Sequence, residues 1–467
     1  MLFHTSLFAA FFLAVFAIAW GLRGRPRLHQ WALVVASFVF YGAWDWRFMF
    51  LLAGSALVNW AAALRIGALA GRARRLTLIA AVAANLAVLG SFKYFDFFIA
   101  SFNALLLDLG FAGELPFAAL ILPVGISFFT FQGISYLVDV NRGDVAASGP
   151  VVEVLLFISL FPQLVAGPIM RAASLLPQIR AHGRPEQGTR HLAVGFAAVM
   201  ILSGLFKKLV LANYIASDLV DDVFFDPGAY GAGDLLLAAY GYSVQIYCDF
   251  SGYSDMAIGL AALLGFTIPI NFNQPFRAVS MREFWRRWHI SLSTWLRDYL
   301  YIPMGGSKGA AWRTRRNLFL TMLLGGLWHG AAWTFVLWGA LHGAFLVAER
   351  ALGRVIRLGR LPALLITFHL VVLTFVIFRI ESLPLLWEYL GGLARWDQPV
   401  ELATPFIAAL IALGLGLHFT PPGLPAALAR GLDTLPWPLI GLVSGLVLAV
   451  IAAIAPSEVT PFIYFQF

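Results

Sequence analysis

Residues 282–342 read REFWRRWHISLSTWLRDYLYIPMGGSKGAAWRTRRNLFLTMLLGGLWHGAAWTFVLWGALH. Arginine and tryptophan crowd the first part, a basic loop follows, and the chain then returns to apolar sequence. His329 lies in that apolar part, directly before Gly330. Because a titratable side chain is costly inside a membrane, an imidazole in such surroundings indicates a functional site. We expect both the fold and the site to be arranged around this stretch.

The composition indicates a membrane protein. Of the 467 residues, 60% are hydrophobic and only 12% are charged, whereas soluble domains are about half apolar and about a quarter charged. Apolar runs long enough to cross a hydrocarbon core of ~30 Å recur along the chain. We therefore expect an all-α, polytopic integral membrane protein in which residues 1–467 form a single membrane-embedded domain.

The net charge of +8 does not require a nucleic acid partner, because Lys and Arg gather in the cytoplasmic loops of membrane proteins. Such basic loops fall at 23–29, 65–75, 171–190, 277–316 and 350–360. The acidic loop 218–234 contains no Lys or Arg and is expected outside. One cysteine, Cys248, leaves no intrachain disulfide framework.

The hydropathy pattern predicts about twelve crossings with both termini outside. The predicted spans are 5–22, 30–44, 46–64, 76–92, 94–112, 117–138, 150–166, 191–212, 234–265, 361–379, 403–419 and 436–455. Segments 94–112 and 150–166 fit the pattern least well, and each could instead lie in the membrane interface. Basic residues follow the first run instead of preceding it, so we expect a retained span and not a cleaved signal.

Residues 317–349 do not fit a single crossing, because basic residues flank both ends. At 1.5 Å per residue one helix would be roughly 50 Å long, too long for one span. Two shorter helices that meet near Gly330 fit better, since the glycines of this stretch permit close helix approach and a break. His329 would then lie at the tip of a hairpin, deep in the protein.

Segment 282–300 is expected to be one helix lying at the cytoplasmic interface with its apolar side inward. Its apolar residues follow helical spacing on one face. They are Phe284, Trp288, Leu292, Trp295 and Tyr299. Glu283 and Arg287 have the spacing of an ion pair on one helix.

Among the histidines, His329 is the strongest candidate for catalysis, as a general base that accepts a proton near neutral pH. The alternative is a core histidine bonded to a backbone carbonyl. His289 is the second candidate, against an ordinary interfacial role. His342 follows His329 by 13 positions, which would turn it to another side of a continuous helix, so we expect it to serve packing. HExxH does not occur, and no metal site is predicted.

Seven basic residues form a dense cytoplasmic patch, which could contact anionic lipid headgroups or dock an anionic acyl donor bearing phosphate. They are Arg286, Arg287, Arg297, Lys308, Arg313, Arg315 and Arg316. The chain ends in PFIYFQF, at 461–467. This tail could anchor at the interface through its aromatic rings, or fold back so that Tyr464 lies near the acceptor or the acyl group.

Two segments resemble the signatures of bacterial membrane-bound O-acyltransferases: EFWRRWHISLSTWLRDYLYIPMGG at 283–306 and GGLWHGAAWTFVLWGALHG at 325–343. SFFTFQGISYLVDVNRG at 127–143, FPQLVAGPIMR at 161–171 and VQIYCDFSGYSDMAIGLAALLGFTIPINFNQPF at 244–276 are similar to the same group. The resemblance covers roughly 30–345, with its signature core at about 120–345, and is nearest to the alginate O-acetyltransferase branch.

The resemblance implies a ring of about 12 membrane helices around a central funnel or tunnel. It implies that His329 is the essential histidine and His289 a supporting one. The acyl thioester donor, acetyl-CoA or a carrier-protein thioester, would come from the cytoplasm. The acceptor would be an exported polysaccharide, and a periplasmic acyltransferase partner could take part. The location would be the bacterial inner membrane, with lipids as neighbours and no bound cofactor.

From the residues alone, weaker candidates to support the site are Trp285, Trp328, Arg286, Arg297, Asn273 and Asp249, together with Tyr464. Three alternatives remain open. The protein could be a transporter or channel for an acyl or glycan precursor, or a structural member of an export complex with an inactive site. Because teichoic acid D-alanyl transfer proteins share the RRWH segment, the acyl group could also be D-alanyl.

Overall fold

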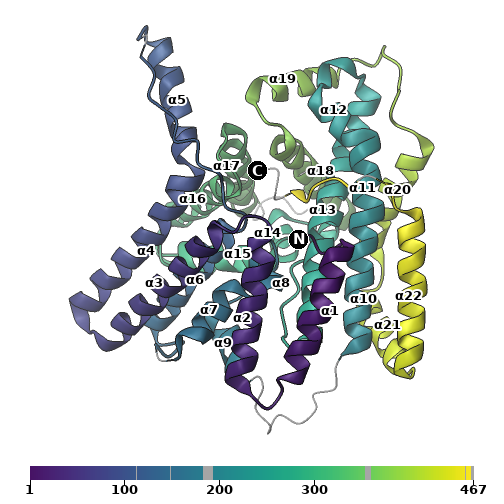
Figure 1. Cartoon of the computed structure of the whole chain (residues 1–467). Helices are drawn as coiled ribbons and strands as arrows, with labels where there is room; N and C mark the ends of the chain where they lie inside the picture. Colours follow the sequence, from purple (N-terminus) through teal and green to yellow (C-terminus); the bar gives the residue numbers. More distant parts are fainter. Residues whose placement is uncertain (112, 148, 182–192, 353–358, 458, 464–467) are drawn as a thin grey trace. The chain divides into compact units, whose positions relative to one another are not determined.

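The computed structural model describes residues 1–467 apart from 112, 148, 182–192, 353–358, 458 and 464–467 (Figure 1). Every regular element in the described ranges is helical, as the composition predicts. The chain divides into two compact units. The first comprises Met1–Leu192 and Ala261–Ile268, and the second comprises Ala193–Leu260 and Pro269–Phe467.

The described residues of the first unit form nine helices and the end of α13. They are α1 (Ser6–Gly21), α2 (Pro26–Gly42), α3 (Phe48–Ala68), α4 (Gly71–Lys93), α5 (Phe95–Asp108), α6 (Ile126–Arg142), α7 (Val151–Ser159), α8 (Phe161–Leu164) and α9 (Ala172–Ala181). The helix α3 packs against α4, α6 and α7. Between α3 and α4 the buried amides of Asn59 and Asn85 exchange hydrogen bonds of 3.1 and 3.0 Å. Each amide thereby satisfies the other in apolar surroundings.

The second unit begins with a long helical stretch through α10 (Val194–Phe206), η1 (Lys207–Ala212), α11 (Asn213–Ile215), η2 (Ala216–Val220) and α12 (Asp221–Phe225), then η3 (Pro227–Ala229) and α13 (Ala232–Leu263). Next come η4 (Pro275–Arg277), α14 (Met281–Arg287), α15 (Ile290–Leu296), η5 (Arg297–Tyr301), α16 (Ala311–His329) and α17 (Trp333–Leu352). It ends with α18 (Arg360–Arg379), α19 (Leu383–Gly392), α20 (Pro405–Gly416), η6 (Leu417–Phe419), α21 (Leu424–Asp433) and α22 (Trp437–Ile454).

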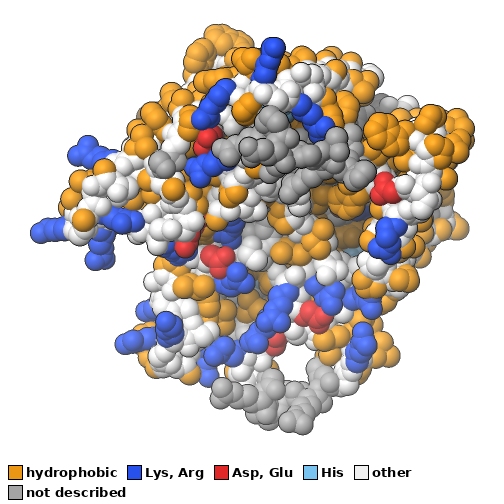
Figure 2. Space-filling model, turned by 90° about the horizontal axis from the view of Figure 1, so that it is seen from below, with side chains coloured by type: hydrophobic (Ala, Val, Ile, Leu, Met, Phe, Trp, Pro, Cys, Tyr) orange, Lys and Arg blue, Asp and Glu red, His pale blue; other side chains and the backbone are white. Residues whose placement is uncertain are grey.

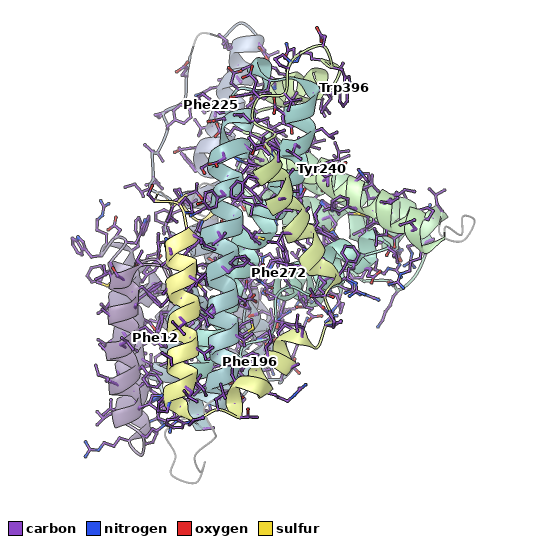
Figure 3. All side chains as sticks on the ribbon, turned by 90° about the vertical axis from the view of Figure 1, so that its right-hand side faces the viewer. Phe12, Phe196, Phe225, Tyr240, Phe272 and Trp396 are labelled. Carbon is purple, nitrogen blue, oxygen red and sulfur yellow. The ribbon has the colours of Figure 1, made fainter. Side chains whose placement is uncertain are left out.

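Six helical segments of the described chain are long and apolar enough to cross a membrane, and up to seven if the pair Pro405–Phe419 and Leu424–Asp433, bent by 83°, counts as one. Apolar side chains reach the surface in many places, coloured orange in Figure 2. Phe225 and Trp396 point outward in Figure 3 and are 86% and 69% exposed. An apolar surface of this extent is typical of lipid-facing helices, and the chain is a multi-pass membrane protein.

Three predicted segments differ from the structure. The span 117–138 begins as a helix only at Ile126, because Gly125 before it has a φ of 76°, in the left-handed region. The span 150–166 contains the nine-residue α7, which ends where Leu160 turns to a ψ of 111° before Phe161 and Pro162. The acidic loop 218–234 is helical up to Phe225, because apolar residues continue there between the acids.

The predicted hairpin is confirmed. α16 ends at His329, and α17 starts again at Trp333 (Figure 1). The two helices pack side by side more extensively than any other pair of elements in the described chain. At Gly339 an added Cβ would lie 2.5 Å from the carbonyl oxygen of Met322, a separation that real Cβ atoms do not reach. Glycine is therefore what lets the two backbones approach.

Candidate active site

The hairpin tip places His329 in an aromatic pocket of the second unit. Its ring centroid lies 5.0 Å from Trp328, 5.0 Å from Trp338 and 5.2 Å from Phe378, each at a steep angle. The side chain is 6% exposed. Large rings on several sides keep bulk solvent away from the imidazole.

His289 lies at a break in the chain, so the expectation of one continuous helix over 282–300 is wrong. Trp288 is extended, with a ψ of 129°, and ends α14, whereas His289 has a φ of 42°. A left-handed backbone at a residue other than glycine costs about 1–3 kcal/mol, and such residues cluster at active sites and ligand clamps. The break turns His289 fully inward, where it is 0% exposed. The predicted ion pair of Glu283 with Arg287 is present at 2.8 Å.

Asn271 supports this break from the preceding loop. Its backbone oxygen accepts the Ile290 N–H at 2.9 Å, and its side-chain Oδ1 accepts the Ser291 N–H at 3.1 Å and the Ser291 hydroxyl at 2.9 Å. These donors are otherwise unpaired at the start of a helix. Asn271 therefore compensates for the strained backbone at His289.

The same amide oxygen fixes the protonation of the His289 ring. Nδ1 lies 3.3 Å from Asn271 Oδ1, an atom that already accepts from Ser291 and can only accept. Nδ1 must then carry the proton, which leaves Nε2 with a free lone pair. Nε2 is buried and has no hydrogen-bond partner among the described residues. Burial lowers the pKa of His289 to about 3, so the imidazole is neutral at physiological pH.

The two histidines belong to one cluster. Their ring centroids are 6.5 Å apart, and the Trp328 ring lies 6.1 Å from His289 as well as next to His329. The cluster also includes His342, whose ring lies 4.4 Å from Trp338. The Trp285 indole donates to His342 Nδ1 at 3.3 Å. His329 and His342 both contact Trp338, whereas the spacing of 13 positions was expected to turn His342 to another side; its packing role stays a prediction.

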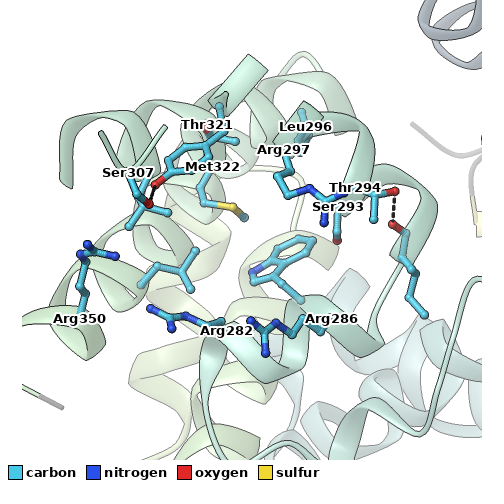
Figure 4. Close-up of a pocket in the computed structure, with 15 residues that line it drawn as sticks. Arg282, Arg286, Ser293, Thr294, Leu296, Arg297, Ser307, Thr321, Met322 and Arg350 are labelled. Atoms are coloured by element: carbon cyan, nitrogen blue, oxygen red, sulfur yellow. Dashed lines mark hydrogen bonds between the residues drawn. The ribbon is translucent and has the colours of Figure 1, made fainter. Parts of the chain in front are cut away.

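A cavity of about 450 Å³ lies beside this cluster (Figure 4). Trp285 lines it and also stands 5.8 Å, ring to ring, from Trp338. The cavity is lined further by Arg282, Arg286, Arg297 and Arg350, with Ser293, Thr294, Ser307 and Thr321, and with apolar side chains such as Ile290 and Met322. The lining thus contains four guanidinium groups and, among the described residues, no carboxylate, a charge that suits an anionic group.

The basic patch expected from the sequence divides into two parts. Arg286 and Arg297 reach the cavity, and Arg297 also pairs with Asp298 at 2.7 Å. Arg313 and Arg316 instead lie over the Trp312 ring, at 5.6 and 5.3 Å. Only part of the patch can therefore serve the cavity.

The remaining candidates are spread more widely. The Asn273 side chain is exposed, and its backbone oxygen accepts from Arg287 at 3.0 Å. Asp249 is buried in an ion pair with Lys208 at 2.8 Å. Tyr464 lies outside the described residues. Among the residues that the structure describes, no group of three or more His, Cys, Asp or Glu side chains is placed to hold a metal ion.

Sequence reasoning missed Asn271, Trp338 and Lys208. Asn271 stands only two positions from Asn273, and the sequence offers no sign of which amide turns inward. Lys208, however, is a charge within the apolar run 191–212, and such residues are functional hypotheses by default. That signal could have marked Lys208 as a candidate for the site, as it did Asp249.

Residues 146–380 match the membrane-bound O-acyltransferase family. This chain belongs to that family. It is 44% identical to a probable alginate O-acetylase of Pseudomonas aeruginosa, over 90% of this chain and 82% of the relative. A probable alginate O-acetylase of Pseudomonas putida is 39% identical over 100% of both chains. The peptidoglycan O-acetyltransferase of Helicobacter pylori is 37% identical over 84% of this chain and 80% of the relative.

The family membership makes the protein a membrane-bound acyltransferase. The resemblance to the alginate O-acetylase branch is confirmed as well, since its relatives match across most of the chain. His289 and His329 both fall within the matched range 146–380.

Proposed function

We propose that this acyltransferase moves an acyl group, expected to be acetyl, from a thioester to hydroxyl groups of an exported polysaccharide. The observation that carries the proposal is the burial of His289 and His329 together, 6.5 Å apart, beside an arginine-lined cavity. The relatives support the acceptor class, because they include a probable alginate O-acetylase and a peptidoglycan O-acetyltransferase.

In the proposed reaction a hydroxyl oxygen of the acceptor attacks the thioester carbonyl carbon. A C–O bond forms, the C–S bond breaks, and the hydroxyl proton passes to an imidazole nitrogen of His329 and then to the leaving thiolate. The products are an ester and a free thiol. The free lone pair on Nε2 suits His289 to accept a hydrogen bond from the acceptor hydroxyl and so orient it.

The donor is proposed to bind with its phosphate groups in the cavity of Arg282, Arg286, Arg297 and Arg350. Guanidinium groups recognise phosphate in bidentate fashion. Acetyl-CoA and the acylated phosphopantetheine arm of a carrier protein each combine a phosphate with a thioester, so either donor could bind to the arginines in this way. Trp285 lines the cavity and contacts the histidine cluster, which supports a thioester that points from the arginines towards His329.

We further propose that the transfer occurs across the bacterial inner membrane, with the donor in the cytoplasm and both termini periplasmic. The ring of about 12 membrane helices around a funnel, and the assignment of 1–467 as one domain with its signature core at about 120–345, are parts of the same proposal. A periplasmic acyltransferase that relays the group to the polymer is compatible with it.

The test is polymer acylation in cells that carry His329→Ala. We expect loss of the acyl ester from the exopolysaccharide, measured by mass spectrometry, while the variant inserts at the normal level. His369→Ala is the matched control, because His369 is an exposed histidine on α18 of the same unit and should leave acylation unchanged. Retained acylation in His329→Ala refutes the proposal, and D-alanyl esters instead of acetyl esters refute the expected acyl group.

A further inference from the structure

A buried ion pair in the second unit takes no part in the chemistry proposed above. Lys208 Nζ, from η1, lies 2.8 Å from Asp249 Oδ1, on α13. The two side chains are 3% and 5% exposed. Burying two charges costs several kcal/mol each before their attraction is counted, so such a pair is weak evidence for stability alone. The other contacts of the pair indicate a role beyond stability.

Both members of the pair also bind the backbone of the C-terminal segment. Lys208 Nζ donates to the Thr460 carbonyl oxygen at 2.9 Å, and Asp249 Oδ2 accepts the Ile463 N–H at 2.8 Å. The Thr460 hydroxyl donates to Asn213 Oδ1 at 2.9 Å. The segment Thr460–Ile463 is thus held at two backbone positions by opposite charges, which we call the tail clamp.

The clamped segment reaches His289 through two aromatic contacts. The Phe462 ring lies 4.7 Å from Tyr253 and 6.3 Å from Phe250. The Phe250 ring in turn meets the His289 imidazole edge to face, at 4.7 Å and 89°. Phe250 directly follows Asp249 in α13, so the clamp and this imidazole contact arise from neighbouring residues. Phe462 and Ile463 are 2% and 3% exposed.

We propose that Lys208 and Asp249 are positioning residues for acyl transfer: by clamping Thr460–Ile463 they hold Phe462 behind Phe250, and Phe250 against His289. The inference rests on the proposed function. His289 sits on strained backbone, Asn271 binds its Nδ1, and the Phe250 ring packs against the imidazole edge to face. Release of the tail would loosen that support and misalign the lone pair on Nε2, which lowers kcat more than it raises KM.

The test replaces the charges without leaving one unpaired. Lys208→Met together with Asp249→Leu exchanges the ion pair for apolar side chains, a change that is often neutral for stability where the new side chains pack well. Neither new side chain can bind the tail backbone. The matched control is Lys207→Met with Asp255→Leu, which removes the neighbouring ion pair between the same two elements. Lys207 donates to Asp255 and to Ser251, not to the tail.

Two readouts are measured on the full chain in detergent. The first is the rate of maleimide labelling of Ile463→Cys in a Cys248→Ala background, since Cys248 is the only cysteine. We expect labelling at least about tenfold faster in the clamp variant and unchanged in the control. The second is acyl transfer from acetyl-CoA to an oligosaccharide, for which we expect kcat to fall at least about tenfold in the clamp variant and KM to stay within about twofold.

Faster labelling with unchanged kcat would overturn the positioning role, and unchanged labelling would overturn the clamp itself. An equal loss of kcat in the control variant would also overturn the proposal, because the effect would then follow from losing any buried ion pair. The proposed function fails separately, if His329→Ala keeps full acyl transfer, and that result leaves the labelling rates interpretable.

Discussion

The imidazoles of His289 and His329 lie 6.5 Å apart, with ring planes inclined by 59°, although α15, η5, a basic loop and the rest of α16 separate them in the chain. Each lies where a helix is interrupted. His289 occupies the gap between α14 and α15, and His329 is the last residue of α16. Side chains at helix ends can point into a shared space that continuous helices would fill, so two interruptions create the site.

Asn271 is predicted to act on the reaction through His289. Asn271→Ala removes the acceptor that keeps the proton on Nδ1 and frees the other tautomer. We expect kcat for acyl transfer to fall by about tenfold or more, with a stability loss of about 1–3 kcal/mol from the unpaired Ser291 donors. Steady-state kinetics and thermal unfolding in detergent measure the two effects.

Ser254→Ala is the control for this prediction. The Ser254 hydroxyl receives a hydrogen bond from the other end of the same amide, Asn271 Nδ2, at 3.4 Å. Its loss leaves Oδ1 in place, so kcat should be unchanged. Equal kinetic effects from both substitutions would mean that Asn271 serves the loop and not the imidazole.

His289 predicts a pH dependence of stability. Its pKa is lowered by burial to about 3, whereas in the unfolded chain it is about 6.5. Below pH 6.5 the unfolded state binds a proton that the native state does not, so stability falls as the pH drops, by at most about 1.4 kcal/mol per unit for this group. Between pH 4 and 7 the unfolding temperature should change less steeply with pH in His289→Gln than in the parent protein. An identical slope in the variant would show that His289 is not buried in its neutral form.

Substitutions of the arginines that line the cavity are predicted to weaken binding of the donor without slowing the acyl-transfer step. Arg286→Gln and Arg350→Gln each remove a guanidinium from the cavity lining. We expect KM for the phosphate-bearing thioester to rise about five- to tenfold, with kcat within about twofold, and the effect to shrink at high salt. Arg315→Gln, at an exposed arginine outside the cavity, should change neither. A fall in kcat at constant KM would show that the cavity does not bind the donor.

The sequence was sufficient for the features that follow from hydropathy and spacing. The all-helical class, the hairpin broken beside His329 and the Glu283–Arg287 pair depend on local pattern, and the structure confirms all three. The break at His289 was out of reach, because the helical spacing of Phe284, Trp288 and Leu292 continues straight through it. That break depends on hydrogen bonds from Asn271, a contact between segments that periodicity does not report.

The sequence also does not predict which charges of the chain pair with each other in space. Lys208 follows Lys207, and Asp249 shares its apolar run with Asp255, so the sequence does not indicate which charges pair. Only their pairing in space, together with the backbone of Thr460 and Ile463, gives them a joint role. The cavity shows the same limit, since Arg282 and Arg350 come from distant parts of the chain and meet only through the fold.

The close approach of α16 and α17 predicts that a single methyl group disables the enzyme. At Gly339 a Cβ would lie 2.5 Å from Met322 O and 3.0 Å from the Cα of Leu323, both backbone atoms that cannot rotate away. Gly339→Ala must therefore push the helices apart, at a cost of about 1–3 kcal/mol, and shift His329 from the ring of Trp338. We expect a lower unfolding temperature and a fall in kcat of at least about tenfold.

Gly441→Ala is the matched control, because Gly441 also lies within a helix, α22, and an added Cβ there meets no atom within 4 Å. Alanine has the higher helix propensity by about 1 kcal/mol, so this variant should be as stable as the parent or slightly more so, with unchanged kcat. If Gly339→Ala behaves like Gly441→Ala in both measurements, the hairpin is not packed through its glycines. The position of His329 would then have to depend on the aromatic pocket alone.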